Sequence, residues 1–156
     1  MDAQTQERVN NAKFIFKFFP NKGVTNREWK AMEAKCLEDL SIGIDYGMTE
    51  SFLDCLSKED IKRNLTKLYP ELSQRSGAPG LINMFLNEMN VGDEILIGRG
   101  AQNILYVATI ASCPYFTKNS KWTQCEFRFL ENLTALFHRR HIINIKRLPS
   151  GITCNK

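Results

Sequence analysis

The pattern of hydrophobic and polar residues is clearest between positions 90 and 112. Two apolar runs, at 94–98 and 104–111, flank a short segment at 99–103 that contains Arg, Gly, Gln and Asn. Two strand-like runs joined by a few turn-forming residues predict a β-hairpin. A Gly-Asp break stands in front of the first run, and the long second strand suggests a small barrel.

Alternating patterns predict further strands. Residues 13–19, KFIFKFF, alternate, so that three Phe side chains share a core face and Lys17 and Phe19 lie on the opposite, more open face. A run at 40–46 is strand-like and contains a Gly, which marks a bulge or a close approach by another group. We also expect strands at 125–130 and, as the last element, at 141–148.

Three segments have the periodicity of amphipathic helices. The first begins near Asn26 and runs to about residue 40. The second begins after Ser57 in a capping-box-like sequence and ends before Pro70, and the third begins at Pro79. Their expected buried stripes are Trp29, Met32, Cys36, Leu37 and Leu40; Ile61, Leu65 and Leu68; and Leu81, Ile82, Phe85, Leu86 and Met89.

The length of 156 residues fits one domain with a proper core. We expect a flexible tail at 1–12, the folded domain at 13–150, and a C-terminal tail or linker at 151–156. Strands and helices in this order predict an α+β fold, an open β-barrel of about five to six mostly antiparallel strands flanked by about three helices.

Composition narrows the class of protein. No apolar run approaches the roughly 20 residues of a membrane helix, and the polar start predicts no signal peptide, so we expect a cytoplasmic protein without a membrane partner. The five Cys are odd in number and form no Cys-x-x-Cys, which favours reduced thiols. With only His138 and His141 as histidines, no metal site is expected.

Charge is unevenly distributed. The chain has a net charge of +4, and residues 117–147 carry seven Lys and Arg against two Glu. A basic C-terminal third on a nearly neutral body is typical of a nucleic-acid face, although an ordinary solvated surface would look the same.

No catalytic set is present in the sequence. There is no Walker lysine motif and no Gly-x-Ser-x-Gly. Glu33-Ala-Lys35 has the Glu-x-Lys spacing of a restriction nuclease, but it lies in the middle of a predicted helix without an evident Asp partner. We therefore expect no enzyme activity and no cofactor, and assign any cutting or nucleotide hydrolysis to a separate domain or partner.

Several short motifs occur in an order that resembles a known family. They are Ile42-Gly43-x-Asp45, Leu68-Tyr69-Pro70, Ile82-x-x-Phe85-x-Asn87-Glu88-Met89-x-Val91-Gly92-Asp93, Pro114-Tyr115 and His138-Arg139-Arg140. Together they resemble PUA-superfamily (EVE/YTH-like) reader domains, and more closely the N-terminal modules of McrB-type and Mrr-type restriction proteins. The resemblance covers residues 13–148. Ile44 stands where family members often carry Trp.

The resemblance implies a reader that takes one modified base, 5-methylcytosine or N6-methyladenine, out of a DNA duplex and holds it in an aromatic pocket for a restriction or defence system. Extrusion costs a few kcal/mol, and stacking on a ring returns roughly 1–3 kcal/mol per base. Candidate pocket residues are Phe19, Ser41, Gly43, Ile44, Asp45, Tyr46, Tyr115 and Phe116. For Phe19 and Phe116, packing in the core is an equal alternative.

Candidates for the nucleic-acid backbone are Lys17, Arg99, Lys118, Lys121, Trp122, Arg139 and Arg140. Trp29 is interpreted as a core anchor. Two other functions stay open: an RNA-binding module that reads a modified nucleoside, and a protein-interaction or ligand-sensing domain whose cleft no longer admits a base. Ile44 in place of Trp favours the last of these, whereas the basic C-terminal third and Trp122 favour nucleic acid.

Overall fold

A computed structural model describes residues 1–17, 26–44, 48, 50–74, 77–100, 102–116 and 138–150. The chain divides into two compact units. Unit 1 consists of Met1–Ile42, Asn90–Ser112 and Arg140–Lys156, and unit 2 consists of Gly43–Met89 and Cys113–Arg139.

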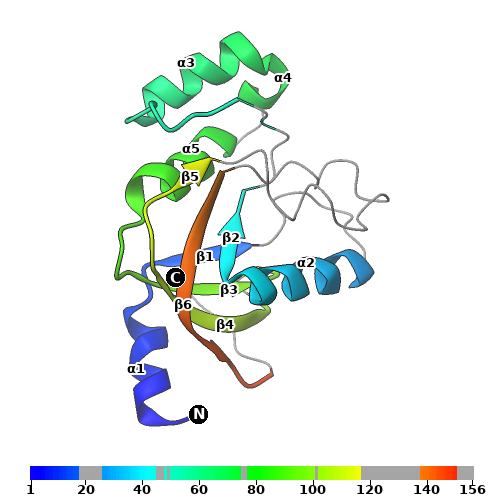
Figure 1. Ribbon diagram of the computed structural model, residues 1–156, viewed down its shortest axis with the longest axis vertical. Helices are drawn as coiled ribbons and strands as arrows, with labels where there is room; N and C mark the ends of the chain where they lie inside the picture. Colours follow the sequence, from blue (N-terminus) through cyan, green and yellow to red (C-terminus); the bar gives the residue numbers. More distant parts are fainter. Residues whose placement is uncertain are drawn as a thin grey trace. The chain divides into compact units, whose positions relative to one another are not determined.

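Within the described residues, one sheet has the order β1 (Phe14–Lys17), β3 (Glu94–Gly98), β4 (Ile104–Ile110), β6 (His138–Arg147) and β2 (Ser41–Gly43). β1 runs parallel to β3, whereas β3–β4 and β4–β6 are antiparallel. Figure 1 shows that the strands curve across one another instead of forming a flat layer. The fold is therefore α+β with a curled, open sheet, as the sequence predicts. The parallel pairing of β1 with β3 was not predicted, and the described residues form more than the three helices expected.

The β3–β4 hairpin confirms the prediction for residues 90–112. Its register pairs Glu94 with Thr109 and Ile97 with Tyr106, and it shifts at Gly98, where a bulge forms. A Cβ atom at Gly98 would overlap the carbonyl oxygen of Asn103, so only glycine fits there. The turn that follows contains Gly100 at φ +137°.

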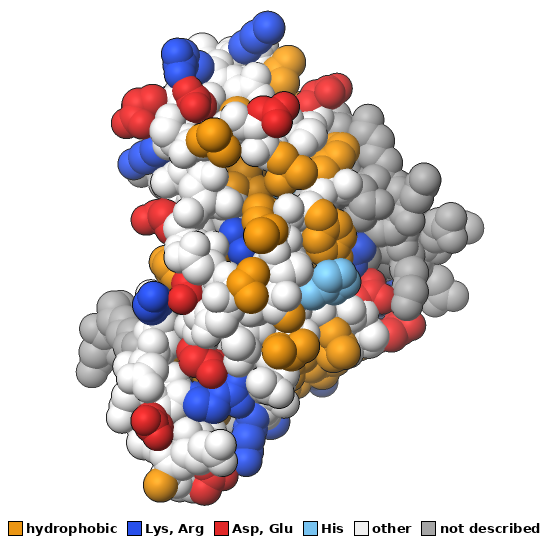
Figure 2. Space-filling view, turned by 60° about the vertical axis from the view of Figure 1, so that its left-hand side comes forward, with side chains coloured by type: hydrophobic (Ala, Val, Ile, Leu, Met, Phe, Trp, Pro, Cys, Tyr) orange, Lys and Arg blue, Asp and Glu red, His pale blue; other side chains and the backbone are white. Residues whose placement is uncertain are grey.

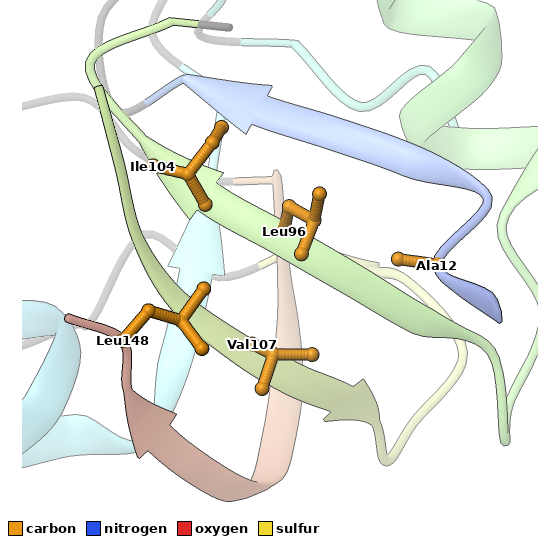
Figure 3. Close-up of a cluster of buried hydrophobic side chains, with 5 residues drawn as sticks. All are labelled: Ala12, Leu96, Ile104, Val107 and Leu148. Atoms are coloured by element: carbon orange, nitrogen blue, oxygen red, sulfur yellow. The ribbon is translucent and has the colours of Figure 1, made fainter. Parts of the chain in front are cut away.

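The core of unit 1 gathers on one face of the curled strands. Ala12, Leu96, Ile104, Val107 and Leu148 point toward one another from β3, β4 and the segments that flank β1 and β6 (Figure 3). Each is at most 3% exposed. Ile104 and Val107 are three residues apart on β4 and share this side because the bulge between them shifts the alternation by one residue.

The expected flexible tail instead forms helix α1 (Ala3–Asn11). Asp2 caps the helix by accepting a hydrogen bond from the Thr5 amide. Arg8 donates to both carboxylate oxygens of Glu94 and to the Thr109 hydroxyl, which ties the helix to β3 and β4. The local sequence of this polar segment does not predict these long-range contacts.

Helix α2 (Asn26–Asp39) has nearly the predicted bounds. Met32 and Cys36 are buried as expected, but Leu37 and Leu40 are 37% and 49% exposed. Leu40 lies beyond the helix at φ +51°, so its side chain leaves the stripe. The buried stripe is narrower than predicted.

Unit 2 contains α3 (Lys58–Leu68), α4 (Pro70–Ser73), α5 (Ala78–Asn83) and the π-helical turn η1 (Met84–Glu88). Ser57 caps α3 by accepting from the Asp60 amide, and Pro79 lies in the first turn of α5, both as predicted. Ile61, Leu65, Ile82 and Phe85 are buried, whereas Leu68 and Leu81 are not.

Strand β6 begins three residues earlier than predicted, since β5 (Tyr115–Phe116) pairs with its first two residues. The strand and loop predicted between 117 and 137 lie outside the described residues. In the described part of the chain, no helix combines the length and apolar character needed to cross a membrane.

Candidate functional site

Four elements or turns of unit 1 bring together five side chains at one end of the sheet. Arg99 follows Gly98 in the turn after β3. β4 and β6 are antiparallel, and Tyr106 lies opposite Arg147. Helix α2 adds Trp29 and Glu33, one turn apart and therefore on one helical face. We call Trp29, Glu33, Arg99, Tyr106 and Arg147 the ring–cation cluster.

Trp29 and Arg99 form the first contact of this cluster. The guanidinium carbon of Arg99 lies 5.5 Å from the centroid of the Trp29 ring, a cation–π distance. Both residues are partly exposed. Lys17 is exposed too, but it pairs with Gly98 and so lies on the face of the sheet opposite to Tyr106, which pairs with Ile97. An aromatic ring therefore lies beside one cation at a surface that water reaches.

Tyr106, Glu33 and Arg147 form the second contact. The Tyr106 hydroxyl donates to Oε1 of Glu33, and Arg147 Nη1 donates to the same oxygen at 2.8 Å and to the Tyr106 hydroxyl at 3.0 Å. The Arg147 guanidinium carbon also lies 5.1 Å from the Tyr106 ring centroid. Three hydrogen bonds fix the carboxylate, the phenol and the guanidinium against one another.

The Tyr106 hydroxyl and the Arg147 guanidinium both stay protonated at neutral pH. Burial, followed by the hydrogen bond to Glu33, raises the pKa of Tyr106 above its ordinary value. The hydrogen bond to Tyr106 raises the pKa of Arg147. The phenol therefore remains a donor and the guanidinium a cation, so the cluster has two cations against one carboxylate.

A second aromatic group lies in unit 2 around His138. The side chains of His138 and Phe52 are buried. His138 Nε2 accepts a hydrogen bond from the Phe52 amide at 2.9 Å, and the His138 carbonyl accepts from the Ile44 amide. The rings of Phe52 and Phe116 meet the imidazole edge-on at centroid distances of 6.1 and 4.9 Å. Burial lowers the pKa of His138 to about 4, so it is neutral and serves as an acceptor.

The predicted pocket residues fall into two classes. Ser41, Gly43 and Ile44 are buried in or directly after β2, and Tyr115 and Phe116 are partly buried in β5. Phe116 packs against the imidazole of His138, and the Ile44 backbone amide donates to the His138 carbonyl. Phe19, Asp45 and Tyr46 lie outside the described residues.

The predicted backbone-binding residues also divide. Arg99 belongs to the ring–cation cluster, and Lys17 is exposed on the other face of the sheet. Lys118, Lys121 and Trp122 lie outside the described residues. Arg139 and Arg140 are 4% and 1% exposed, a setting different from the open surface that the prediction assumes. Arg140 donates to the Ser112 carbonyl at 3.1 Å, so its hydrogen bonding serves the interior of unit 1.

Sequence reasoning missed four members of the ring–cation cluster. It interpreted Trp29 as core, discounted Glu33 with its motif and assigned no role to Tyr106 or Arg147. The available signals were the spacing of Trp29 and Glu33 on one helical face and a Tyr within the apolar run of β4. Lys35 pairs with Glu38, so the structure separates the two ends of the Glu-x-Lys motif.

Two open hollows lie elsewhere. One, of about 620 Å³ in unit 1, is lined mainly by polar residues of α1 and β6, but Arg8 pairs with Glu94 and Lys146 pairs with Asp2 there. The other, of about 560 Å³ in unit 2, lies over α3 beside Cys55. Burial raises the pKa of the Cys55 thiol, so it stays protonated and is a poor nucleophile.

The described residues contain no group of three or more His, Cys, Asp and Glu placed to hold a metal ion. Cys36, Cys55 and Cys113 form no disulfide with one another. Figure 2 shows one face of the molecule, on which Lys and Arg side chains are interspersed with Asp and Glu around exposed hydrophobic side chains. This face has mixed charge, unlike the ring–cation cluster.

Comparison with known families identifies a family whose description names no activity. Residues 23–134 match the family model described as Domain of unknown function (DUF8426), so the chain belongs to this family. No curated protein and no solved structure matches the chain. The matched region includes Trp29, Glu33, Arg99 and Tyr106 of the ring–cation cluster and ends before Arg147.

Proposed function

We propose that this DUF8426 member is a nucleic-acid-binding reader that recognises a modified base, 5-methylcytosine or N6-methyladenine, in DNA. The observation that carries the proposal is the ring–cation cluster, in which Arg99 stacks on Trp29 and Arg147 stacks on Tyr106 at the same end of one sheet.

The cluster has the chemistry that an extruded nucleotide needs. A base stacked on an aromatic ring gains roughly 1–3 kcal/mol, which offsets the few kcal/mol that extrusion costs. Guanidinium planes stack on bases as well, and Arg and Lys bind the flanking phosphates. Trp29 and Arg99 are only partly buried, so a base can reach them without unfolding the unit.

The modified-base part of the proposal rests on the family resemblance of the motifs, among them Ile42-Gly43-x-Asp45 and His138-Arg139-Arg140. The resemblance also names Asp45 and Tyr46 as pocket residues, and both lie outside the described residues. Cleavage or nucleotide hydrolysis belongs to a nuclease or NTPase domain or subunit, and this chain is the targeting domain of a modification-dependent restriction system.

Direct binding tests the proposal. Fluorescence anisotropy with duplexes containing one 5-methylcytosine, one N6-methyladenine or neither should show tighter binding to a modified duplex. Trp29→Ala should weaken that binding by about tenfold or more because it removes the stacking ring, whereas Trp29→Phe should retain much of it. Circular dichroism of both variants checks that unit 1 remains folded.

Salt dependence tests the cations. Arg99→Gln should reduce the slope of log K against log salt by about one, because one phosphate contact is lost. Arg63→Gln is the matched control, since Arg63 is exposed on α3 and pairs with Asp60. Absence of binding to every duplex at low salt, or normal binding by Trp29→Ala, would refute the proposal. Tighter binding to single-stranded RNA than to any duplex would identify RNA as the substrate.

A further inference from the structure

The two carboxylate oxygens of Glu33 differ in their hydrogen bonding. Oε1 accepts hydrogen bonds from the Tyr106 hydroxyl and from Arg147 Nη1. Among the described residues, none donates to Oε2. The Glu33 side chain retains 18% of its exposure, so a ligand can approach it.

The donors on Oε1 hold the carboxylate in one orientation. Tyr106 is 8% exposed and sits in the middle of β4, and Arg147 is held by its own stacking on the Tyr106 ring. An ionised carboxylate can only accept hydrogen bonds. The remaining oxygen is therefore an acceptor held in one orientation, on a residue that lies one helical turn from Trp29 on the same face of α2.

We propose that Glu33 determines which bases the domain accepts, through a hydrogen bond from the exocyclic amine of a base stacked on Trp29 to Glu33 Oε2. This inference rests on the proposed function and extends it to a substrate class. Cytosine and adenine carry such an amine, 5-methylcytosine keeps both of its N–H groups, and N6-methyladenine keeps one. Thymine, uracil and hypoxanthine place a carbonyl oxygen at the same position, which a carboxylate repels.

Matched pairs of bases isolate this single contact. Each probe is a duplex in which one base stands opposite an abasic site, so that the cost of extrusion is similar within a pair. 5-Methylcytosine and thymine form one pair, and adenine and hypoxanthine form the other. A charge-assisted hydrogen bond predicts that the native protein binds the amine-bearing member about tenfold more tightly in at least one pair.

Glu33→Gln should abolish or reverse this preference, because the glutamine amide can donate to a carbonyl oxygen. Glu38→Gln, on the same helix and 57% exposed at the side chain, removes the same charge and should leave the preference intact. The readout is the ratio of the two dissociation constants within a pair, which a purely structural role of Glu33 would not change.

The outcomes separate the two proposals. Binding with equal affinity for both members of each pair would overturn the role of Glu33 and leave the reader function standing. The same holds if Glu33→Gln weakens both members of a pair by the same factor, since Glu33 would then only attach α2 to the sheet. Absence of binding to all probes would overturn both proposals.

Discussion

The two ends of β6 carry similar side chains in opposite surroundings. At the start of the strand, His138, Arg139 and Arg140 are at most 4% exposed. At its end, Lys146 and Arg147 are 52% and 57% exposed at the side chain. Arg140 donates to a main-chain carbonyl in the interior, whereas Arg147 lies over an aromatic ring at the surface.

This difference shows that a basic residue type alone does not identify a binding face. The first end of β6 is covered by β5 and by the segment around Phe52, so its polar groups act within the fold. The last end meets α2 and β4, whose rings and carboxylate leave Arg147 accessible. Function at the second end should therefore be separable from stability at the first.

The largest effect should come from Arg140→Ala. Removing this 1%-exposed side chain leaves a cavity and an unsatisfied carbonyl at Ser112, so we expect a loss of about 4 kcal/mol of unfolding free energy. Urea denaturation measures it. Arg147→Ala is the control and should cost less than about 1 kcal/mol, because exposed ion pairs contribute little. Similar losses of unfolding free energy in the two variants would show that the two ends of β6 contribute equally to stability.

His138→Ala should cost about 3 kcal/mol in the same assay. It leaves the buried Phe52 amide without its acceptor and removes the ring that contacts Phe116. His141→Ala, three residues along the same strand, changes an exposed side chain and should stay within about 0.5 kcal/mol. Equal stability of the two variants would mean that the His138 cluster is not part of the folded core.

A smaller effect should appear on acidification. The pKa of His138 is lowered to about 4 in the folded state against an ordinary value of 6.5, so its contribution to stability is complete above pH 6.5 and falls as the pH drops toward 4. The loss between pH 8 and pH 5 should be about 2 kcal/mol. His138→Gln should lack this dependence, and a native protein whose stability is flat between pH 8 and pH 5 would show that folding does not lower the pKa of His138.

Local patterns predicted much of the fold. The β3–β4 hairpin, the Ser57 cap and the start of α5 at Pro79 follow from periodicity and turn chemistry that a few neighbouring residues specify. Helix α1 was not predicted from local patterns, because it is held by the contact between Arg8 and Glu94, which are 86 residues apart in the sequence.

The candidate site was harder to predict for the same reason. Arg99 could be selected as a cation in a turn, but Trp29, Glu33, Tyr106 and Arg147 come together only through the packing of α2 on β4 and β6. Arg139 and Arg140 read as a basic surface motif, and their burial depends on the pairing of β5 with the start of β6 and on the Ser112 carbonyl.

Gly98 limits how the specificity of this domain could be redesigned. Its lack of a side chain lets the backbone of Asn103 close the turn, and Gly100 has a backbone conformation that other residues rarely adopt. A randomised library aimed at new ligands should therefore keep both glycines and the loop length, and diversify Arg99 and Gln102. Such a library would change the chemical groups offered to the ligand while preserving the framework that presents them.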